Sequence, residues 1–231
     1  MPETITLTAA HDGFAFTALH AQPEAPGAGK PPRGGVIVIQ EIFGLDAYVR
    51  EDVARWAARG FEVVAPSMFD RGQKGFTAAH DEAGFARGRE LALANGPENA
   101  MGDVQACIDF LSPRGPVFVV GYCYGGTMAW LAASRCEGLA AAASYYGGQV
   151  IGMAKFALAA PAIVHLGRKD PHIPADQVKA ALQAAHPEVP VHIYEASGHG
   201  FNNDGRPESD LADAELARQR TVEFFVLHGA A

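Results

Sequence analysis

The chain has 231 residues, of which 48% are hydrophobic and 19% are charged. This length and composition allow a large core, so a disordered chain is excluded and a single domain spanning residues 1–231 is expected. The formal net charge is −8 at pH 7, and an acidic surface repels phosphate backbones, so we expect no nucleic-acid partner.

The first elements predict a hairpin followed by a buried strand. Residues 5–7 and 14–21 alternate apolar and polar side chains around His11-Asp12-Gly13, and Asp-Gly between alternating runs indicates a hairpin. Residues 22–35 are rich in Pro and Gly and predict a loop. Residues 36–40 are an unbroken apolar run ending in Gln40, typical of a strand buried on both faces of a parallel sheet.

Strand and helix patterns alternate along the rest of the chain. Further strands are expected at 61–65, 117–120, 139–146, 162–166 and 191–194. Helices are expected at 48–59, 99–111, 127–135, 174–186 and 208–228. This alternation predicts an α/β fold with a mostly parallel sheet of about eight strands and helices on both faces. Residues 67–97 are polar and contain scattered glycines. They are expected to form a partly helical excursion over the carboxyl edge of the sheet.

Chemically active side chains follow four of the expected strands. Glu41 follows 36–40 and Cys123 follows 117–120. Asp170 follows 162–166, and His199 follows 191–194. Because ligands of α/β sheets bind beyond the carboxyl ends of the strands, we expect these four side chains to converge on one edge.

The segment around Cys123 has the pattern of a nucleophile elbow. Gly121-Tyr122-Cys123-Tyr124-Gly125 matches G-x-S-x-G, with cysteine in place of serine. The elbow would point the sulfur outward at a helix N-terminus, where the macrodipole favours a thiolate. It would also leave the backbone N–H of Tyr124 free to donate to an oxyanion. The alternative is a strand–helix turn with a buried, inert cysteine.

The chain order of Cys123, Asp170 and His199 is that of the α/β-hydrolases, whose nucleophile, acid and base follow successive strands. Asp170 alone also fits a turn ahead of a helix that starts at Pro174. His199 lies between two glycines, in a loop too tight for a packing role. No metal-binding motif is present in the sequence, and no cofactor is expected.

The sequence also indicates a reducing compartment. Its three cysteines, Cys107, Cys123 and Cys136, are an odd and sparse set, which suggests free thiols. No basic run precedes an apolar stretch at the N-terminus, and no apolar run approaches the roughly 18 residues of a membrane span. We therefore expect a cytoplasmic protein without a membrane partner.

Four motifs together resemble the dienelactone hydrolase (carboxymethylenebutenolidase) family. They are Glu41-Ile42-Phe43-Gly44, Gly121-Tyr122-Cys123-Tyr124-Gly125-Gly126, Gly167-x-x-Asp170 and Gly198-His199-Gly200-Phe201. The resemblance runs from the strand at 36–40 to the C-terminal helix and implies an α/β-hydrolase fold. It also implies a Cys123–His199–Asp170 triad that hydrolyses small esters or lactones through an acyl-cysteine intermediate.

The same resemblance implies roles for three neighbours of the thiol. Backbone N–H groups of Ile42 and Tyr124 would form the oxyanion hole. Glu41 would lie close to the resting thiol and take part in its activation. A carboxylate beside the sulfur opposes thiolate formation, and a substrate that displaces Glu41 would remove that opposition. The alternative for Glu41 is a cap on the helix that begins near Asp46.

The sequence departs from the family pattern at the position that would read the substrate's carboxylate. Family members specialised for dienelactone hold its carboxylate with two arginines, one of them four residues after the catalytic histidine. In this chain that position is Asn203, and Arg206 lies three residues further on. Arg87 and Arg89 are the candidates for the other arginine.

Phe43, Tyr145 and Tyr146 are expected to wall an apolar substrate pocket, with core packing as the alternative. The expected partner is a small-molecule ester or lactone, and the expected state is a monomer or weak homodimer. The alternative function is a non-catalytic protein of the same fold that binds a small ligand or senses redox state through Cys123.

Overall fold

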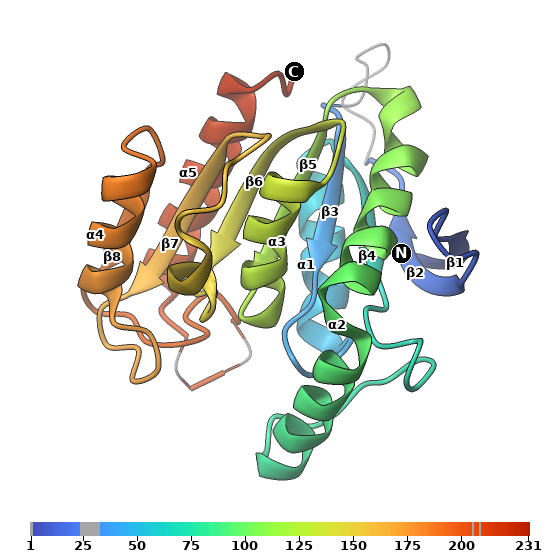
Figure 1. Cartoon of the computed structure of the whole chain (residues 1–231), viewed down its shortest axis with the longest axis horizontal. Helices are drawn as coiled ribbons and strands as arrows, with labels where there is room; N and C mark the ends of the chain where they lie inside the picture. Colours follow the sequence, from blue (N-terminus) through green and yellow to red (C-terminus); the bar gives the residue numbers. More distant parts are fainter. Residues whose placement is uncertain (1, 24–32, 205, 208) are drawn as a thin grey trace.

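The computed structural model describes residues 2–23, 33–204, 206–207 and 209–231. Within these residues, eight strands form one sheet in the order β1-β2-β4-β3-β5-β6-β7-β8 (Figure 1). The bounds of the strands are β1 (Glu3–Thr8), β2 (Ala15–Ala21), β3 (Gly35–Ile39), β4 (Glu62–Pro66), β5 (Val117–Tyr122), β6 (Leu139–Tyr145), β7 (Ala162–Gly167) and β8 (Val191–Tyr194). Strand β2 runs antiparallel to β1 and β4, and all other neighbours are parallel.

Helices cover both faces of this sheet (Figure 1). Helices α1 (Ala47–Ala58) and α5 (Leu211–Leu227) share one face, where the rings of Trp56 and Phe225 lie 5.8 Å apart. On the other face lie α2 (Glu82–Leu111), α3 (Tyr124–Arg135) and α4 (Ala175–Ala185), with two short 3₁₀ turns, η1 (Ser112–Arg114) and η2 (Val150–Met153). The predicted α/β-hydrolase fold with a mostly parallel sheet is thus confirmed. Most of the loop expected at 22–35 lies outside the described residues.

The central strands are buried on both faces, as their unbroken apolar runs predict. Every residue of β3, β4 and β5 is buried. On the face covered by α1 and α5, the ring of Phe118 stacks on that of Phe225 at 4.5 Å. The rigid centre of the sheet therefore supports the loops that follow β3 and β5.

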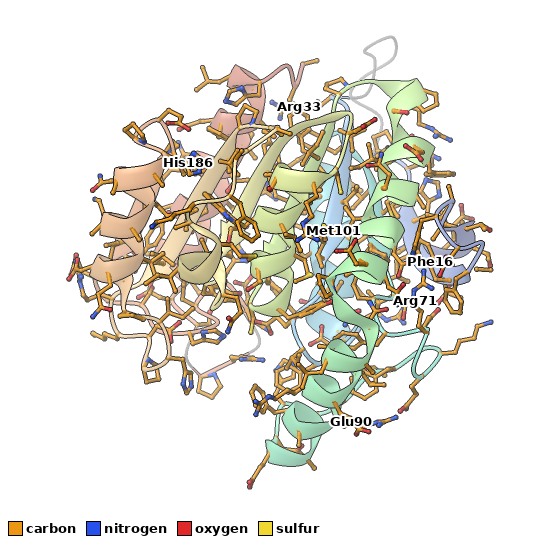
Figure 2. All side chains as sticks on the ribbon, viewed as in Figure 1. Phe16, Arg33, Arg71, Glu90, Met101 and His186 are labelled. Carbon is orange, nitrogen blue, oxygen red and sulfur yellow. The ribbon has the colours of Figure 1, made fainter. Side chains whose placement is uncertain are left out.

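Helix α2 is longer than the sequence pattern predicts. The pattern places a helix at 99–111, whereas the structure continues it back to Glu82 through a break at Gly96, where φ is 67° and ψ is 168°. Pro97 follows the break and lacks the N–H that an unbroken helix would use. The first part of α2, on which Figure 2 labels Glu90, projects past the edge where the parallel strands end (Figure 1).

None of the described helices is both long enough and apolar enough to cross a lipid bilayer.

A buried carboxylate on α1, that of Asp52, is the centre of a hydrogen-bond network on the face of the sheet that α1 and α5 cover. Asp52 is fully buried and accepts hydrogen bonds from the hydroxyl of Tyr122 at 2.6 Å and from Trp56 Nε1 at 3.1 Å. Arg55 Nη1 donates to its other oxygen at 2.7 Å. The Tyr122 hydroxyl thus joins α1 to the last residue of β5, directly before Cys123.

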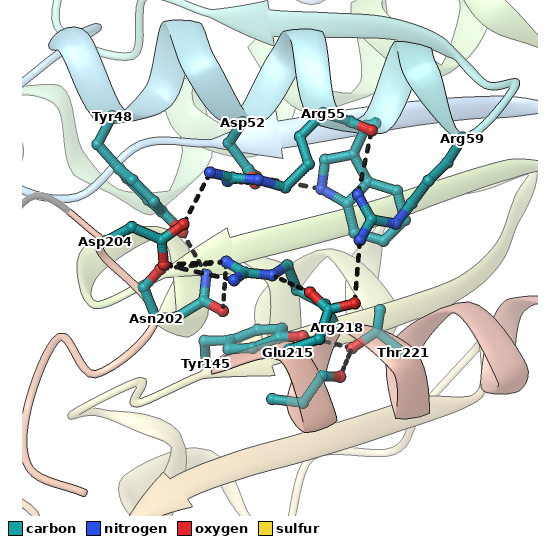
Figure 3. A network of polar contacts seen from close by, with 12 residues as sticks. Tyr48, Asp52, Arg55, Arg59, Tyr145, Asn202, Asp204, Glu215, Arg218 and Thr221 are labelled. Carbon is teal, nitrogen blue, oxygen red and sulfur yellow. Dashed lines mark hydrogen bonds and ion pairs between the residues drawn. The ribbon is translucent and has the colours of Figure 1, made fainter. Parts of the chain in front are cut away.

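The same network reaches the segment that follows His199 (Figure 3). Arg55 Nη2 also donates to Asp204 Oδ2 at 2.8 Å, and Arg218 of α5 pairs with Asp204 Oδ1 at 3.3 Å. Asn202 hydrogen-bonds to the hydroxyl of Tyr48 on α1. Residues 202–204 are therefore tied to both α1 and α5.

We predict that Asp52→Ala lowers the free energy of unfolding by about 3–5 kcal/mol, because it leaves Arg55 and the Tyr122 hydroxyl without their buried partner. Urea denaturation measures this change. The exposed neighbour Glu51 is the control, since Glu51→Ala should stay within about 0.5 kcal/mol of the parent. A loss below about 1 kcal/mol for Asp52→Ala would show that the network is dispensable.

Candidate functional site

The turn between β5 and α3 places Cys123 at the carboxyl edge of the sheet. Cys123 has a φ of 53° and a ψ of −110°, a conformation that non-glycine residues rarely adopt outside functional sites. A Cβ on Gly121 would lie 2.0 Å from the carbonyl oxygen of Gly125, and a Cβ on Gly125 would lie 2.2 Å from that of Ile39. Glycine is thus required at both positions because the neighbouring backbone leaves no room for a Cβ. The local geometry matches a nucleophile elbow.

Asp170 and His199 meet in the same place. His199 Nδ1 lies 2.6 Å from Asp170 Oδ2. Asp170 Oδ1 accepts backbone N–H bonds from His172 at 2.8 Å and Ile173 at 3.2 Å. Asp170 therefore has two roles at once. One oxygen holds the turn before α4, and the other holds the imidazole of His199.

The imidazole of His199 is hydrogen-bonded to Asp170 and lines both cavities together with Cys123. Burial alone would lower the pKa of His199, but the hydrogen bonds and charges of these two neighbours outweigh burial and raise this pKa to about 10. The ring therefore carries a positive charge at neutral pH.

Glu41 is almost completely buried and faces Arg206. Its Oε2 accepts hydrogen bonds from Arg206 Nη2 at 2.9 Å and from Asn203 Nδ2 at 3.3 Å. Its Oε1 is buried without a hydrogen-bond partner among the described residues. The helix-cap alternative for Glu41 is wrong, because Asp46 caps α1 by accepting the N–H of Val49 at 3.0 Å.

Arg206 connects the loop that carries His199 to the segment before α2. Its Nε donates to His80 Nδ1 at 2.8 Å, and its guanidinium lies 5.1 Å from the centre of the Phe43 ring. The rings of Phe43 and His80 are 4.2 Å apart. Arg206 is therefore built into the wall of the site from three directions.

Two cavities meet at Cys123 and His199. The first has a volume of about 630 Å³ and is mostly apolar; it is lined by Ile42, Phe85, Arg89, Ala92, Leu93, Gly96, Pro97, Cys123, Tyr124, Thr127, Met128, Leu131, Gly148, Gln149, Met153, His172, Ile173 and His199. The second, of about 520 Å³, is lined by Glu41, Ile42, Phe43, Phe85, Cys123, Lys169, Pro171, His172, Gly198, His199 and Arg206. Cavities of this size suit small-molecule ligands.

The sequence-based expectation for the two tyrosines needs correction. Tyr145 and Tyr146 are fully buried and line neither of these cavities. The hydroxyl of Tyr145 hydrogen-bonds to Thr221 Oγ1 at 2.6 Å in the core. Tyr146, which has a φ of 38°, packs its ring 5.1 Å from that of His199. Tyr146 therefore supports the imidazole from behind, while Phe43 does line the second cavity.

Arg87 also does not lie where it was expected. It pairs with Gln73 at 3.1 Å and with Glu90 at 2.6 Å, and it lines neither cavity. Arg89 lines the first cavity instead. Residues two apart on a helix point about 200° away from each other, so only one of these arginines can face the site.

Several residues that line the two cavities were not predicted from the sequence. Phe85 and Leu93 are large apolar side chains within an otherwise polar stretch, and this contrast is the signal that could have found them. Lys169 and Pro171 flank Asp170 and could have been found from that position. His172, whose ring is 5.9 Å from that of His199, lines both cavities and could have been found from its position two residues after Asp170.

No group of three or more His, Cys, Asp or Glu side chains that could hold a metal ion occurs among the described residues.

The model of the dienelactone hydrolase family matches residues 16–228. The chain belongs to this family. A carboxymethylenebutenolidase of Pseudomonas putida is 30% identical over 226 residues, which cover 93% of this chain and 92% of the relative. A putative carboxymethylenebutenolidase of Azospirillum brasilense is 32% identical over 236 residues, which cover 97% of this chain and 98% of the relative. Membership of the dienelactone hydrolase family makes the protein a hydrolase.

Solved structures agree with the fold. A putative dienelactone hydrolase from Klebsiella pneumoniae superimposes with a TM-score of 0.81 at 24% identity, over 98% of this chain and 99% of that one. A dienelactone hydrolase-like promiscuous phosphotriesterase from metagenomic libraries superimposes with a TM-score of 0.74 at 19% identity, over 98% of each chain. At these identities the likeness establishes the α/β-hydrolase fold.

We predict that the ring of His199 keeps its proton through neutral pH and loses it near pH 10, because Asp170 and Cys123 raise its pKa from the ordinary 6.5. NMR titration of the histidine rings measures this, with His199→Gln assigning the signal. In Asp170→Asn the ring should lose its proton at a lower pH, since burial then opposes the charge. Titration near pH 6.5 in the parent protein would contradict this geometry.

Proposed function

We propose that this hydrolase cleaves small esters or lactones through an acyl-cysteine intermediate at Cys123. The observation that carries the proposal is the position of His199, which hydrogen-bonds to Asp170 at 2.6 Å and lines the same two cavities as Cys123. Nucleophile, base and orienting acid in this arrangement suit acyl transfer.

In the first step, the sulfur of Cys123 attacks the carbonyl carbon and forms a carbon–sulfur bond. Negative charge moves to the carbonyl oxygen, where the backbone N–H groups of Ile42 and Tyr124 would stabilise it. Tyr124 is the first residue of α3, and the N–H groups of a first helical turn have no partner within the helix. The carbon–oxygen bond then breaks, and the His199 imidazolium donates its proton to the departing alkoxide.

In the second step, water attacks the thioester carbonyl. Neutral His199 accepts a proton from the water, and the carbon–sulfur bond breaks to release the acid. The sulfur leaves beside the reprotonated imidazole, and the site is ready for another substrate. Asp170 holds the ring in one tautomer throughout and stabilises its positive charge.

Glu41 is proposed to control the charge on Cys123. Its carboxylate lines the same cavity as the sulfur, and a nearby negative charge disfavours a thiolate. Arg206, 2.9 Å from Glu41, partly neutralises that charge. A substrate that alters this ion pair would therefore alter the reactivity of the sulfur.

Ligand binding without catalysis, or redox sensing through Cys123, remains the second candidate function. Cys123 is partly exposed and lines both cavities, which a sensor would need. A binding or sensing site has no need of an imidazole held by a carboxylate, so the position of Asp170 favours hydrolysis.

We predict that Cys123→Ala lowers kcat for p-nitrophenyl acetate by about 10³-fold or more, because the nucleophile is lost. Stoichiometric iodoacetamide labelling of the parent protein should abolish turnover and be absent from Cys123→Ala. The buried Cys136 serves as control, and Cys136→Ala should keep both turnover and labelling. Labelling of Cys123 without any ester turnover would support the second candidate.

We predict that Glu41→Gln makes Cys123 react about three- to tenfold faster with iodoacetamide at pH 6, because a negative charge near the sulfur is removed. Ester turnover should fall several-fold, since Arg206 loses the carboxylate that holds it. Glu51→Gln, on the exposed side of α1, should change neither rate. The role of Glu41 would be refuted by a variant in which alkylation and turnover both match those of the parent.

A further inference from the structure

The first cavity extends well beyond the thiol along one face of α3. Tyr124, Thr127, Met128 and Leu131 line it at helical spacing. Leu131 lies eight residues beyond Cys123, which is about 12 Å along the helix at 1.5 Å per residue. An acetyl group on the sulfur would occupy only the near end of such a cavity.

The opposite wall comes from the first part of α2. Phe85, Ala92 and Leu93 line the cavity from this side. Phe85 is 49% exposed and Leu93 is 73% exposed, so an apolar ligand in the cavity would remove apolar surface from water. This wall lies close to the reaction centre, because a Cβ on Gly88 would approach the carbonyl oxygen of Ile42 to 1.9 Å.

Few polar groups interrupt this lining. Thr127 Oγ1 already accepts the backbone N–H of Gln149 at 3.3 Å. Arg89 is exposed, and no carboxylate is among the lining residues that the structure describes. Met153 adds a further apolar side chain to the lining. The lining therefore suits an uncharged apolar chain.

The second cavity has more charged side chains than the first. It is lined by Glu41, Lys169 and Arg206 together with His199. Cys123 and His199 line both cavities, so the acyl and alcohol parts of an ester can each occupy one of them. We assign the acyl part, which stays on Cys123, to the cavity along α3, because no carboxylate and few polar groups line it among the described residues.

We propose that the cavity between α2 and α3 is an acyl-chain site, and that the substrates are esters of apolar carboxylic acids about six to eight carbons long. The proposal rests on ester hydrolysis at Cys123 and adds the class of acid that is released. Specificity would come from the apolar side chains of Phe85, Leu93, Met128 and Leu131.

The test is a series of p-nitrophenyl esters from acetate to octanoate, assayed with the parent protein. We expect kcat/KM to rise about two- to fourfold for each added methylene up to the hexanoate or octanoate. Ala92→Trp, which fills the cavity from α2, should reduce the octanoate-to-acetate ratio of kcat/KM at least tenfold. Ala94→Trp is the matched control, because Ala94 lies on the same helix outside the lining and should leave that ratio unchanged.

Failure of the acyl-chain site and failure of the proposed function give different results. Ester turnover without dependence on acyl length, or dependence on the alcohol chain in a series from ethyl to octyl acetate, would overturn the acyl-chain site and leave hydrolysis intact. A second measurement is calorimetric binding of methyl octanoate and methyl butyrate to Cys123→Ala. Tighter binding of the octanoate that Ala92→Trp abolishes supports the site even if no ester is turned over, and equal binding overturns it.

Discussion

The close approach of α3 to β3 and β5 is the constraint on which the rest of the site depends. The first turn of α3 lies against the carbonyl groups of the neighbouring chain, and there is no room for a Cβ at Gly121 or Gly125. This approach forces Cys123 into a conformation with positive φ. The residue at the bend is thereby raised out of the sheet, with its sulfur at the junction of two cavities.

The remaining groups are brought to the sulfur by loops that leave the same edge of the sheet. Asp170 is held by two backbone N–H groups before it holds His199, so the imidazole is positioned by the turn at the end of β7. The segment after His199 is anchored separately, since Asp204 pairs with Arg55 of α1 and Arg218 of α5 (Figure 3). If His199 is the base, as proposed, it is already in place and needs little rearrangement during reaction.

Family membership and substrate preference have different physical origins in this protein. The family model matches residues 16–228, which include the turn at Cys123 and the pair of Asp170 and His199 at the sheet edge. The walls of the cavities come from the segment before α2, from α2 itself and from the loop around Arg206. In this chain Arg206 is occupied by Glu41 and His80, while α2 presents apolar side chains. The surroundings of the thiol thus combine one charged wall with one apolar wall.

The sequence by itself determined the alternation of strands and helices, the elbow glycines and the convergence of Cys123, Asp170 and His199, because each depends on local pattern or on the rule that parallel strands end at one edge. Tertiary structure alone decided that Arg89 rather than Arg87 lines a cavity and that Tyr145 packs in the core. It also decided the partners of Asp52, whose network joins residues as far apart in the chain as Arg55 and Asp204, 149 positions. Packing sets which side of α2 faces the cavity and which distant residues pair with one another. Neither leaves a periodic signal in the sequence.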